Sequence, residues 1–414
     1  MINILLGLLV ISIVFVMVLI WSRGERSILL PLLISLVIGF CLSITQAFFF
    51  ILPQGGSDAV TFERVAWEWG QDGFRVALSN YTGASSYFLS WLISLFYGAL
   101  DRSQFAAQNI SIAFNLGSVL FCYKLALLLW GESVARRAIW VAALFPVLLL
   151  HSALILRESY VSFFFVAGSY FLAKWVITKR NIFFLSSFAS FSAATFFHGG
   201  MVFSIVGFFL YFSFSLVKSS ASSFKPSNAS SLSSVVTGVA VLVVVCAVIV
   251  AGINVPKVGD VSRFTDEGHA ESAFIERAVR ARGDAAHPSW TLINSNREIL
   301  PKLPIRVSYF LFSPFPWDVR SPSHLIGLID SLFYIFLFFF LVKARGAVIN
   351  NKPALAVAVV LMVCLVVFSM GVTNFGTGIR HRAKFVPVLI ALAAIMIPSF
   401  RVLNRSVRHP ERAS

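Results

Sequence analysis

The chain has 414 residues, of which 58% are hydrophobic and only 12% are charged. Its mean hydropathy of +0.85 and its long apolar runs exclude an ordinary soluble domain. They indicate a polytopic membrane protein, because about 20 apolar residues span a bilayer as a helix. The net charge is +15, but the basic residues lie between the apolar runs. We therefore expect membrane lipids or an anionic lipid-linked substrate as partners, and no nucleic acid.

The apolar runs predict about twelve transmembrane helices. They lie at 3–21, 28–52, 84–100, 105–130, 138–156, 159–177, 182–198, 201–217, 235–253, 324–342, 354–372 and 385–400. The predicted fold class is therefore an all-α, polytopic membrane bundle with one large extracytoplasmic loop. A shorter apolar piece at 305–315 is predicted to be re-entrant or interfacial.

Composition also predicts how the chain is organised. Its parts are an N-terminal transmembrane bundle at 1–217 with a first outer loop at 53–83, a Ser-rich cytoplasmic linker at 218–234, a C-terminal transmembrane bundle at 235–400 with an outer loop at 254–323, and a basic cytoplasmic tail at 401–414. We expect the linker to be flexible, because Ser-rich segments behave as flexible chains.

Lys and Arg in short loops predict the orientation, since they favour the cytoplasmic side. If the later spans alternate, that side carries the basic residues of 136–137, 179–180, 343–352 and 401–412. The loop at 254–323 and Arg380 then lie outside. The basic residues of 23–26 place the 53–83 loop outside too, whereas counting back from the C-terminus places it inside. One segment between 84 and 156 must then be re-entrant or miscounted.

The first outer loop carries an acidic segment that includes Asp58 and Glu63. Structurally, Asp58 would cap a helix that starts at Ala59, since Asp is a favoured N-cap residue. Functionally, Asp58 or Glu63 would act as a general base for a sugar hydroxyl, or would orient the acceptor. The two interpretations are compatible, and the sequence does not choose between them.

Two further polar sites lie at the ends of apolar runs. Arg157 and Glu158 form either a neutralising ion pair at a hairpin or a site in which Arg157 binds a phosphate or sugar that Glu158 positions. His198 stands beside Gly199 and Gly200. It is either a satisfied interfacial residue or part of the same outer cavity, as an acid/base group or a lipid-phosphate contact.

Aromatic and proline residues fill the stretch 312–320, just before a predicted span. In one interpretation they form a rigid belt at the membrane interface. In the other, the exposed aromatic face of Trp317 stacks on a sugar ring, which would suit a glycan channel.

A basic segment at 373–384 separates the last two apolar runs. It carries Arg380, His381, Arg382 and Lys384. Charge so close to hydrocarbon is costly and indicates a functional site. Guanidinium groups match phosphate oxygens in a bidentate way, so we predict that this segment binds a phosphate or pyrophosphate. The alternative is an ordinary basic loop at a membrane face.

The motifs of soluble enzymes are absent from the sequence, which has no P-loop, HExxH, GxSxG or GxGxxG pattern. ATP hydrolysis and nucleotide-sugar binding of the soluble type therefore have no support. The four cysteines lie inside apolar runs at no metal-like spacing. We predict neither disulfides nor a metal site, and no cofactor.

The order of these segments resembles that of bacterial surface-polysaccharide membrane proteins. The likeness covers most of the chain and rests on Ser-Asp-Ala at 57–59, Phe-Pro at 145–146 followed by Arg-Glu at 157–158, Phe-Pro-Trp at 315–317, and Asn-Phe-Gly-Thr-Gly-Ile-Arg-His-Arg-Ala-Lys at 374–384. The proteins concerned are the O-antigen and exopolysaccharide repeat-unit polymerases and the related GT-C-type glycosyltransferases.

The resemblance implies a multi-pass protein of the bacterial cytoplasmic (inner) membrane with its active site on the extracytoplasmic side. Its substrate would be a glycan on undecaprenyl diphosphate, and it admits a chain-length regulator and a flippase as protein partners. It makes Arg157, Arg380 and Arg382 contacts to the lipid diphosphate, and Asp58 a base or metal ligand by position. Metal-dependent members of the family carry a second acidic cluster, and this chain has only Glu158 in its place. The resemblance therefore gives a bound divalent metal no support.

We therefore predict a membrane glycosyltransferase that polymerises undecaprenyl-diphosphate-linked repeat units. The residues expected to activate the acceptor are Asp58, Glu158 and His198, and those expected to bind substrate are Arg157, Trp317, Arg380, His381, Arg382 and Lys384. The alternatives are a GT-C-type transferase with a polyprenyl-phosphate sugar donor, a ligase, and a flippase of lipid-linked glycan. A flippase would carry its charges along a path through the membrane, so charges clustered on one face favour an enzyme.

Overall fold

The computed structural model describes residues 2–81, 83, 86–222 and 284–398. Regular secondary structure in these residues is helical, and β-type pairing within them is limited to an isolated antiparallel bridge between Ala286 and Asn374. The predicted span at 235–253, the tail at 401–414 and most of the predicted linker lie outside the described residues.

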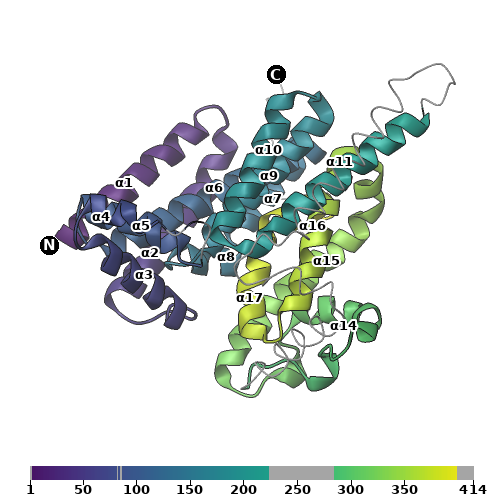
Figure 1. The fold of residues 1–414 in the computed structure, drawn as a ribbon. Coiled ribbons are helices and arrows are strands. Elements are labelled where there is room, and N and C mark those ends of the chain that lie inside the picture. Colours follow the sequence, from purple (N-terminus) through teal and green to yellow (C-terminus); the bar gives the residue numbers. More distant parts are fainter. Residues whose placement is uncertain (1, 82, 84–85, 223–283, 399–414) are drawn as a thin grey trace, which may run out of the picture.

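Six helices in the described part are long and apolar enough to cross a bilayer. They are α1 (Ile2–Ser22), α2 (Leu29–Phe48) together with η1 (Arg26–Ile28), α6 (Gln104–Trp130), α9 (Glu158–Thr178), α15 (Pro322–Asn350) and α16 (Lys352–Gly371). A seventh span results if α7 (Glu132–Ala143) and α8 (Pro146–Ser152), which are bent by 56° at their junction, count as one. The prediction of an all-α polytopic membrane protein is thus confirmed (Figure 1).

The predicted count of about twelve spans is too high for the described part. Its shorter apolar helices are α5 (Phe88–Ala99), α10 (Asn181–Phe197), and η2 (Gly199–Met201) running into α11 (Val202–Ser222). The run at 84–100 yields only the 12 residues of α5. Such a helix is about 18 Å long, well short of the roughly 30 Å of a hydrocarbon core.

The remaining helices are short. They are α3 (Ser57–Gly70), α4 (Phe74–Ser79), η4 (Ser289–Thr291), η5 (Asn296–Glu298), α14 (Ile299–Phe312), η6 (Pro316–Asp318), α17 (Phe375–Ala383) and α18 (Val386–Ala393). The apolar piece predicted at 305–315 is the second half of α14. Close packing joins α3 and α4 to α5, because a Cβ on Gly70 of α3 would lie 2.8 Å from the Ser94 carbonyl oxygen, and a Cβ on Gly98 of α5 would lie 2.8 Å from backbone atoms of Gly73 and Phe74.

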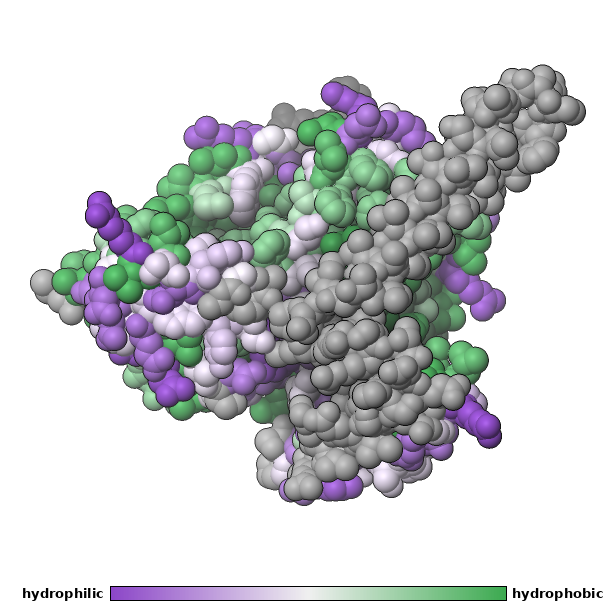
Figure 2. Space-filling model, viewed as in Figure 1, coloured by the Kyte–Doolittle hydropathy of each residue, from purple (hydrophilic) through white to green (hydrophobic). Residues whose placement is uncertain are grey.

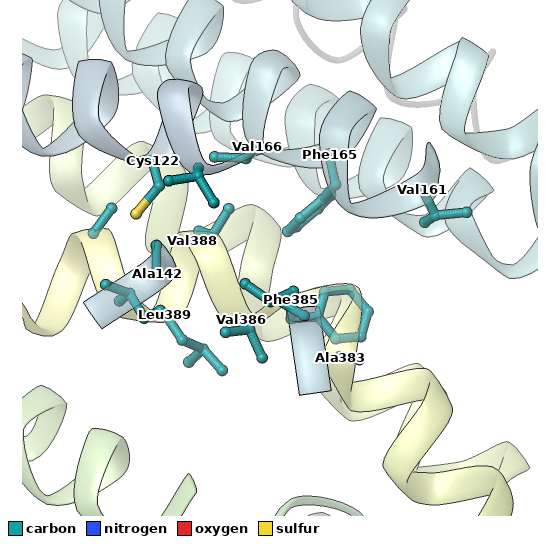
Figure 3. Close-up of a cluster of buried hydrophobic side chains, with 14 of the residues drawn as sticks. Cys122, Ala142, Val161, Phe165, Val166, Ala383, Phe385, Val386, Val388 and Leu389 are labelled. Atoms are coloured by element: carbon teal, nitrogen blue, oxygen red, sulfur yellow. The ribbon is translucent and has the colours of Figure 1, made fainter. Parts of the chain in front are cut away.

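The run predicted to span the membrane at 385–400 instead begins with an enclosed helix. All eight residues of α18 are buried. Phe385, just before α18, packs edge-on against Phe165 of α9, with ring centroids 5.2 Å apart. Figure 3 shows Val388 and Leu389 in the same apolar cluster as Cys122 of α6. This helix therefore fills the space between α6, α7, α9 and α15.

Contacts between helix ends define two ends of the bundle. At the first, which we call the site end, Ser103 just before α6 donates a hydrogen bond to the Asn3 carbonyl of α1 (2.9 Å). At the second, the turn end, Asn351 between α15 and α16 donates to the Leu129 carbonyl of α6 (3.0 Å). The α1–α2 and α9–α10 connections also lie at the turn end, at the top of Figure 1, while α3, α14 and α17 lie at the lower, site end.

Apolar side chains cover the outer faces of the long helices. On α1 the exposed ones include Leu5, Leu9 and Ile13, and on α15 they include Ile329 and Phe336. Figure 2 shows hydrophobic residues over the upper left part of the coloured surface and the most hydrophilic residues toward its edges. This distribution suits helices surrounded by lipid.

Candidate functional site

Arg380 is the centre of a charged cluster at the site end. It lies in the last turn of α17, and its guanidinium forms ion pairs with Asp58 in the first turn of α3 and with Glu158 in the first turn of α9. The contact from Nη2 of Arg380 to Oε1 of Glu158 measures 3.4 Å. One side chain therefore joins three helices and brings two predicted catalytic carboxylates to a predicted substrate-binding cation.

Lys384 and His381 extend this cluster. Nζ of Lys384 lies 3.8 Å from Oε1 of Glu158 and 2.7 Å from Nδ1 of His381. Burial, reinforced by the charge of Lys384, holds the pKa of His381 well below its usual range. The neutral imidazole can therefore accept a hydrogen bond from the ammonium group. His198 packs edge-on against His381, with ring centroids 4.9 Å apart, and so borders the cluster.

Arg157 lies directly before α9 and is almost fully buried. Its Nη1 donates to the Phe197 carbonyl (3.5 Å), and its guanidinium lies over the Phe62 ring, 4.9 Å from the centroid. Burial lowers the pKa of this guanidinium; the Glu158 carboxylate opposes that change, and the charge of Arg380 adds to it. An arginine keeps its proton all the same. Arg157 is thus a further buried cation within electrostatic reach of Arg380.

The charges of this cluster do not cancel. The cations Arg157, Arg380 and Lys384 face the carboxylates Asp58 and Glu158, so three positive and two negative charges leave +1. Among the described residues no hydrogen-bond partner is found for Nε of Arg157, Nε of Arg380 or Oε2 of Glu158, all of which are buried. Buried polar atoms are normally hydrogen-bonded. The cluster therefore has net positive charge and two buried guanidinium donors for an anionic ligand, whereas Oε2 of Glu158 can only accept a hydrogen bond, as from a hydroxyl.

The start of α3 places Asp58 toward Arg380. The helix begins at Ser57 after Gly56, so Asp58 lies inside its first turn and does not cap a helix that starts at Ala59. An acidic residue in the first turn is favoured by the helix dipole. The prediction that Asp58 is the N-cap of this helix is therefore wrong, because Gly56 holds that position and Asp58 instead forms an ion pair with Arg380.

Glu63, the other acid considered in this segment, is engaged elsewhere. Arg102 binds its carboxylate through Nε and Nη2 (2.9 and 2.7 Å), and the hydroxyl of Tyr97 donates to it (3.2 Å). These bonds fasten α3 to the end of α5 and the loop before α6. Of the two acids, Asp58 is the one that reaches the cluster.

The N-terminus of α17 is fixed by a side-chain cap and by backbone bonds. Oδ1 of Asn374 accepts hydrogen bonds from the backbone amides of Gly376 (2.8 Å) and Thr377 (3.4 Å). The amide of Phe375 donates to the Ala285 carbonyl (3.0 Å). The helix that carries Arg380 is therefore held by the segment that follows residue 283.

Asn374→Ala is expected to lower the free energy of unfolding by about 1 kcal/mol, the usual effect of losing an N-cap. Any activity that depends on Arg380 should fall as well, because the cap orients the helix that carries it. Thermal unfolding of the detergent-purified protein, together with an assay of the function proposed below, measures the two effects. The matched control is Asn351→Ala, which removes the cap of α16 at the turn end. Equal losses of activity in the two variants would show that the Asn374 cap does not position Arg380.

Arg382 points into a different part of the molecule and has no exposed surface. Its Nε and Nη2 pair with Oδ2 of Asp330 in α15 (3.1 and 2.6 Å). Its Nη1 donates to the carbonyls of Leu311 and Ser313 at the end of α14 (2.8 and 2.7 Å). Every guanidinium nitrogen is thus engaged in joining α17 to α14 and α15. The predicted contact of Arg382 with a diphosphate would require these bonds to break.

Trp317, in η6, belongs to an aromatic group beyond α14. Its ring stacks on Phe315 at 4.8 Å with an interplanar angle of 6°, and its Nε1 donates to the hydroxyl of Tyr309 (3.4 Å). The Trp317 side chain is 70% exposed. These contacts do not join it to the Arg380 cluster, and its open face suits either a membrane interface or a sugar ring.

Sequence reasoning missed two charged residues that hold α17 and the end of the preceding helix, α16. Asp330 is the partner of Arg382, and Arg306 of α14 donates hydrogen bonds to the carbonyls of Met370 (3.2 Å) and Val372. Asp330 did carry a signal, since it is a lone acid inside an apolar run and such acids usually have a partner. Arg306 lies similarly among apolar residues of 305–315.

His151 at the end of α8 is a second buried group that the sequence analysis did not select. Its Nε2 lies 2.9 Å from Oε1 of Gln54, in the loop that leads to α3. Gln54 adopts the left-handed backbone conformation, with φ of 64°. The Ser159 hydroxyl donates to the His151 carbonyl (3.2 Å), which ties the start of α9 to α8.

The side chains of the cluster do not form a set of metal ligands. Over residues 2–81, 83, 86–222 and 284–398 no group of three or more His, Cys, Asp or Glu side chains could hold a metal ion. Asp58 and Glu158 both face the Arg380 guanidinium, which lies where a cation shared by the two would lie. The described residues of the cluster therefore place an arginine, and not a set of metal ligands, between the two carboxylates.

Comparisons with known proteins bear on the fold. No family model and no curated protein matches the sequence. The structure is similar to the crystal structure of the oligosaccharyltransferase of Archaeoglobus fulgidus in its apo form, with a TM-score of 0.51 and 14% sequence identity. The likeness covers 90% of this chain and 50% of that one, so the chain spans about half the length of the solved structure. At this identity the likeness shows a shared fold.

Proposed function

We propose that this protein is a membrane glycosyltransferase that polymerises oligosaccharide repeat units carried on undecaprenyl diphosphate. The observation that carries the proposal is the Arg380 guanidinium, which links the carboxylates of Asp58 and Glu158 where the membrane helices end. A diphosphate donor needs cations to receive its charge, and an acceptor hydroxyl needs a base. In the cluster, the Arg380 cation directly contacts the two carboxylates that could act as the base.

The proposed reaction transfers a glycan from one lipid diphosphate to the hydroxyl of another repeat unit. A carboxylate takes the proton of the acceptor hydroxyl, whose oxygen forms a bond to the anomeric carbon of the donor. The bond between that carbon and the diphosphate oxygen breaks, and its electron pair leaves with the diphosphate. Arg380, Lys384 and Arg157 are placed to stabilise the charge that develops there.

The shared fold adds support for glycosyl transfer, since the protein of similar structure is by its name an oligosaccharyltransferase. The grouping of the charges at one end of the bundle favours an enzyme over a flippase, whose charges would follow a path across the membrane. A GT-C-type transferase that uses a polyprenyl-phosphate sugar remains the alternative, because the cations of the cluster suit a monophosphate too.

We further propose that the site end faces the extracytoplasmic side of a bacterial inner membrane. The short connections at the turn end carry Arg23, Lys179, Arg180 and Lys352, and short basic loops favour the cytoplasm. Because α5 is too short to cross the bilayer, the whole segment 53–103 lies on the side of the cluster. Leaving 84–100 out of the count places the 53–83 loop on the outer side, as the basic residues of 23–26 predict.

A polysaccharide profile tests the proposal. In a strain that lacks the gene, single repeat units should remain on the surface while the long-chain ladder disappears from a gel. A shortened or undecorated repeat would instead establish a transferase that builds the unit. Loss of all surface product, with lipid-linked repeats accumulating inside, would establish a flippase.

A further inference from the structure

The two carboxylates that bind Arg380 differ in their exposure. The Asp58 side chain is 50% exposed, the Arg380 side chain is 18% exposed, and the Glu158 side chain is 1% exposed. One partner of the guanidinium is therefore enclosed by protein, and the other lies on the open side of the cluster.

Glu158 is held in place by more than Arg380. Its Oε1 is also 3.8 Å from Nζ of Lys384, and Arg157 precedes it in the chain. Removing a buried carboxylate from such cations is costly, because it leaves uncompensated charge in a medium of low dielectric constant. Glu158 is thus a fixed counter-ion that keeps the guanidinium in position.

Asp58 is bound far less firmly. A half-exposed ion pair contributes little free energy, since water and salt compete for both charges. The side chain can leave Arg380 for solvent without the desolvation cost that would confine Glu158. Asp58 therefore binds one side of the Arg380 guanidinium weakly, and a more highly charged anion could displace it there.

We propose that Asp58 is a displaceable counter-ion: the donor's diphosphate takes its place on Arg380, and the released carboxylate then becomes the base that accepts the acceptor's proton. This proposal rests on the proposed function. While Asp58 is bound to Arg380, its Oδ2 accepts a hydrogen bond from the guanidinium, so the carboxylate is held on the arginine and is not turned toward an acceptor hydroxyl. A diphosphate offers more charge and a bidentate match to the guanidinium, so it should win the exchange. Binding of the diphosphate would thus both fill the donor site on Arg380 and free Asp58 to act as the base.

Asp58→Asn tests this exchange by binding alone. If the carboxylate competes for Arg380, its removal should tighten the binding of undecaprenyl diphosphate by about two- to fivefold, in line with the small free energy of an exposed pair. The measurement is equilibrium titration of the full-length purified protein in lipid nanodiscs. Transfer by the same variant should be lost, because the base is gone. Thermal unfolding checks that the variant is folded.

A double-mutant cycle separates displacement from a simple change in net charge. In an Arg380→Gln background, Asp58→Asn should tighten binding much less than it does in the natural protein, because there is no guanidinium left to release. Equal tightening in both backgrounds would show a general charge effect and overturn the proposal. Unchanged or weaker binding by Asp58→Asn would overturn it as well.

Failure of the proposed function gives a different result. If the natural protein does not bind undecaprenyl diphosphate at all, the donor assignment falls before Asp58 is considered. If it binds the lipid and polymerises repeats, but the cycle shows no coupling between Asp58 and Arg380, the function stands and the displacement is rejected.

Discussion

Arg380→Gln is expected to lower glycosyl transfer by about 10²–10³-fold, the loss that follows removal of one donor to developing negative charge. The guanidinium contacts both site carboxylates and is the group best placed to meet the leaving diphosphate. Arg380→Lys keeps the charge but loses the planar fork, so it should recover only part of the rate. The assay is chain extension by purified protein supplied with an undecaprenyl-diphosphate-linked repeat unit.

Arg345→Gln provides the matched control for this variant. Arg345 is an exposed arginine of α15 close to the turn end, far along that helix from its start at the site end. Its replacement should leave the rate unchanged. If Arg380→Gln were as active as Arg345→Gln, Arg380 would have no part in the reaction.

Arg382→Ala is expected to lower the free energy of unfolding by about 3–5 kcal/mol, the effect of breaking a buried ion pair from one side. The change leaves Asp330 buried without the guanidinium that binds it, and leaves the carbonyls of Leu311 and Ser313 without their donor. Thermal unfolding of the detergent-purified protein, together with its yield from membranes, measures the loss.

The double variant Arg382→Met with Asp330→Asn removes both charges and should be more stable than Arg382→Ala alone, because no uncompensated charge remains. An Arg382→Ala protein with natural stability would contradict the structural role. If that stable protein also failed to bind undecaprenyl diphosphate, the substrate contact predicted from the sequence would hold in its place.

Hydropathy predicted the fold class but could not predict which apolar runs cross the membrane. The run at 84–100 and the run at 385–400 are apolar for different reasons: α5 packs on α3 at the site end, and α18 is enclosed by other helices. Burial against protein and burial in lipid select the same residue types. Only the length of the helix distinguishes burial against protein from burial in lipid, and helix boundaries are the feature that a single sequence predicts least well.

The sequence grouped four basic residues at 380–384, and the structure divides them. Successive residues of a helix are about 100° apart, so residues two positions apart point in nearly opposite directions. Arg380, His381 and Lys384 therefore share one face of α17 and its end, while Arg382 faces α14 and α15. Treating the segment as a helix, with Asn374 as its cap, would have predicted this division.

The site itself could be predicted only as a set of separate segments. The cost of charge beside hydrocarbon singles out Glu158 and Arg380, while Asp58 stands out as a candidate general base and by its position in the family resemblance. That they meet could not be predicted, because it depends on how α3, α9 and α17 pack at the site end.

The distance along the chain between these groups has a consequence for biogenesis. Glu158 and Arg380 are separated by 222 residues. At a synthesis rate of about 5–20 residues per second, the carboxylate enters the membrane roughly 10–45 s before its guanidinium partner is made. In that interval the nascent chain holds the Glu158 carboxylate without Arg380, and under the proposed function it lacks the cation that would receive the diphosphate's charge. The proposed site is therefore completed only once the segment that carries Arg380 has been made.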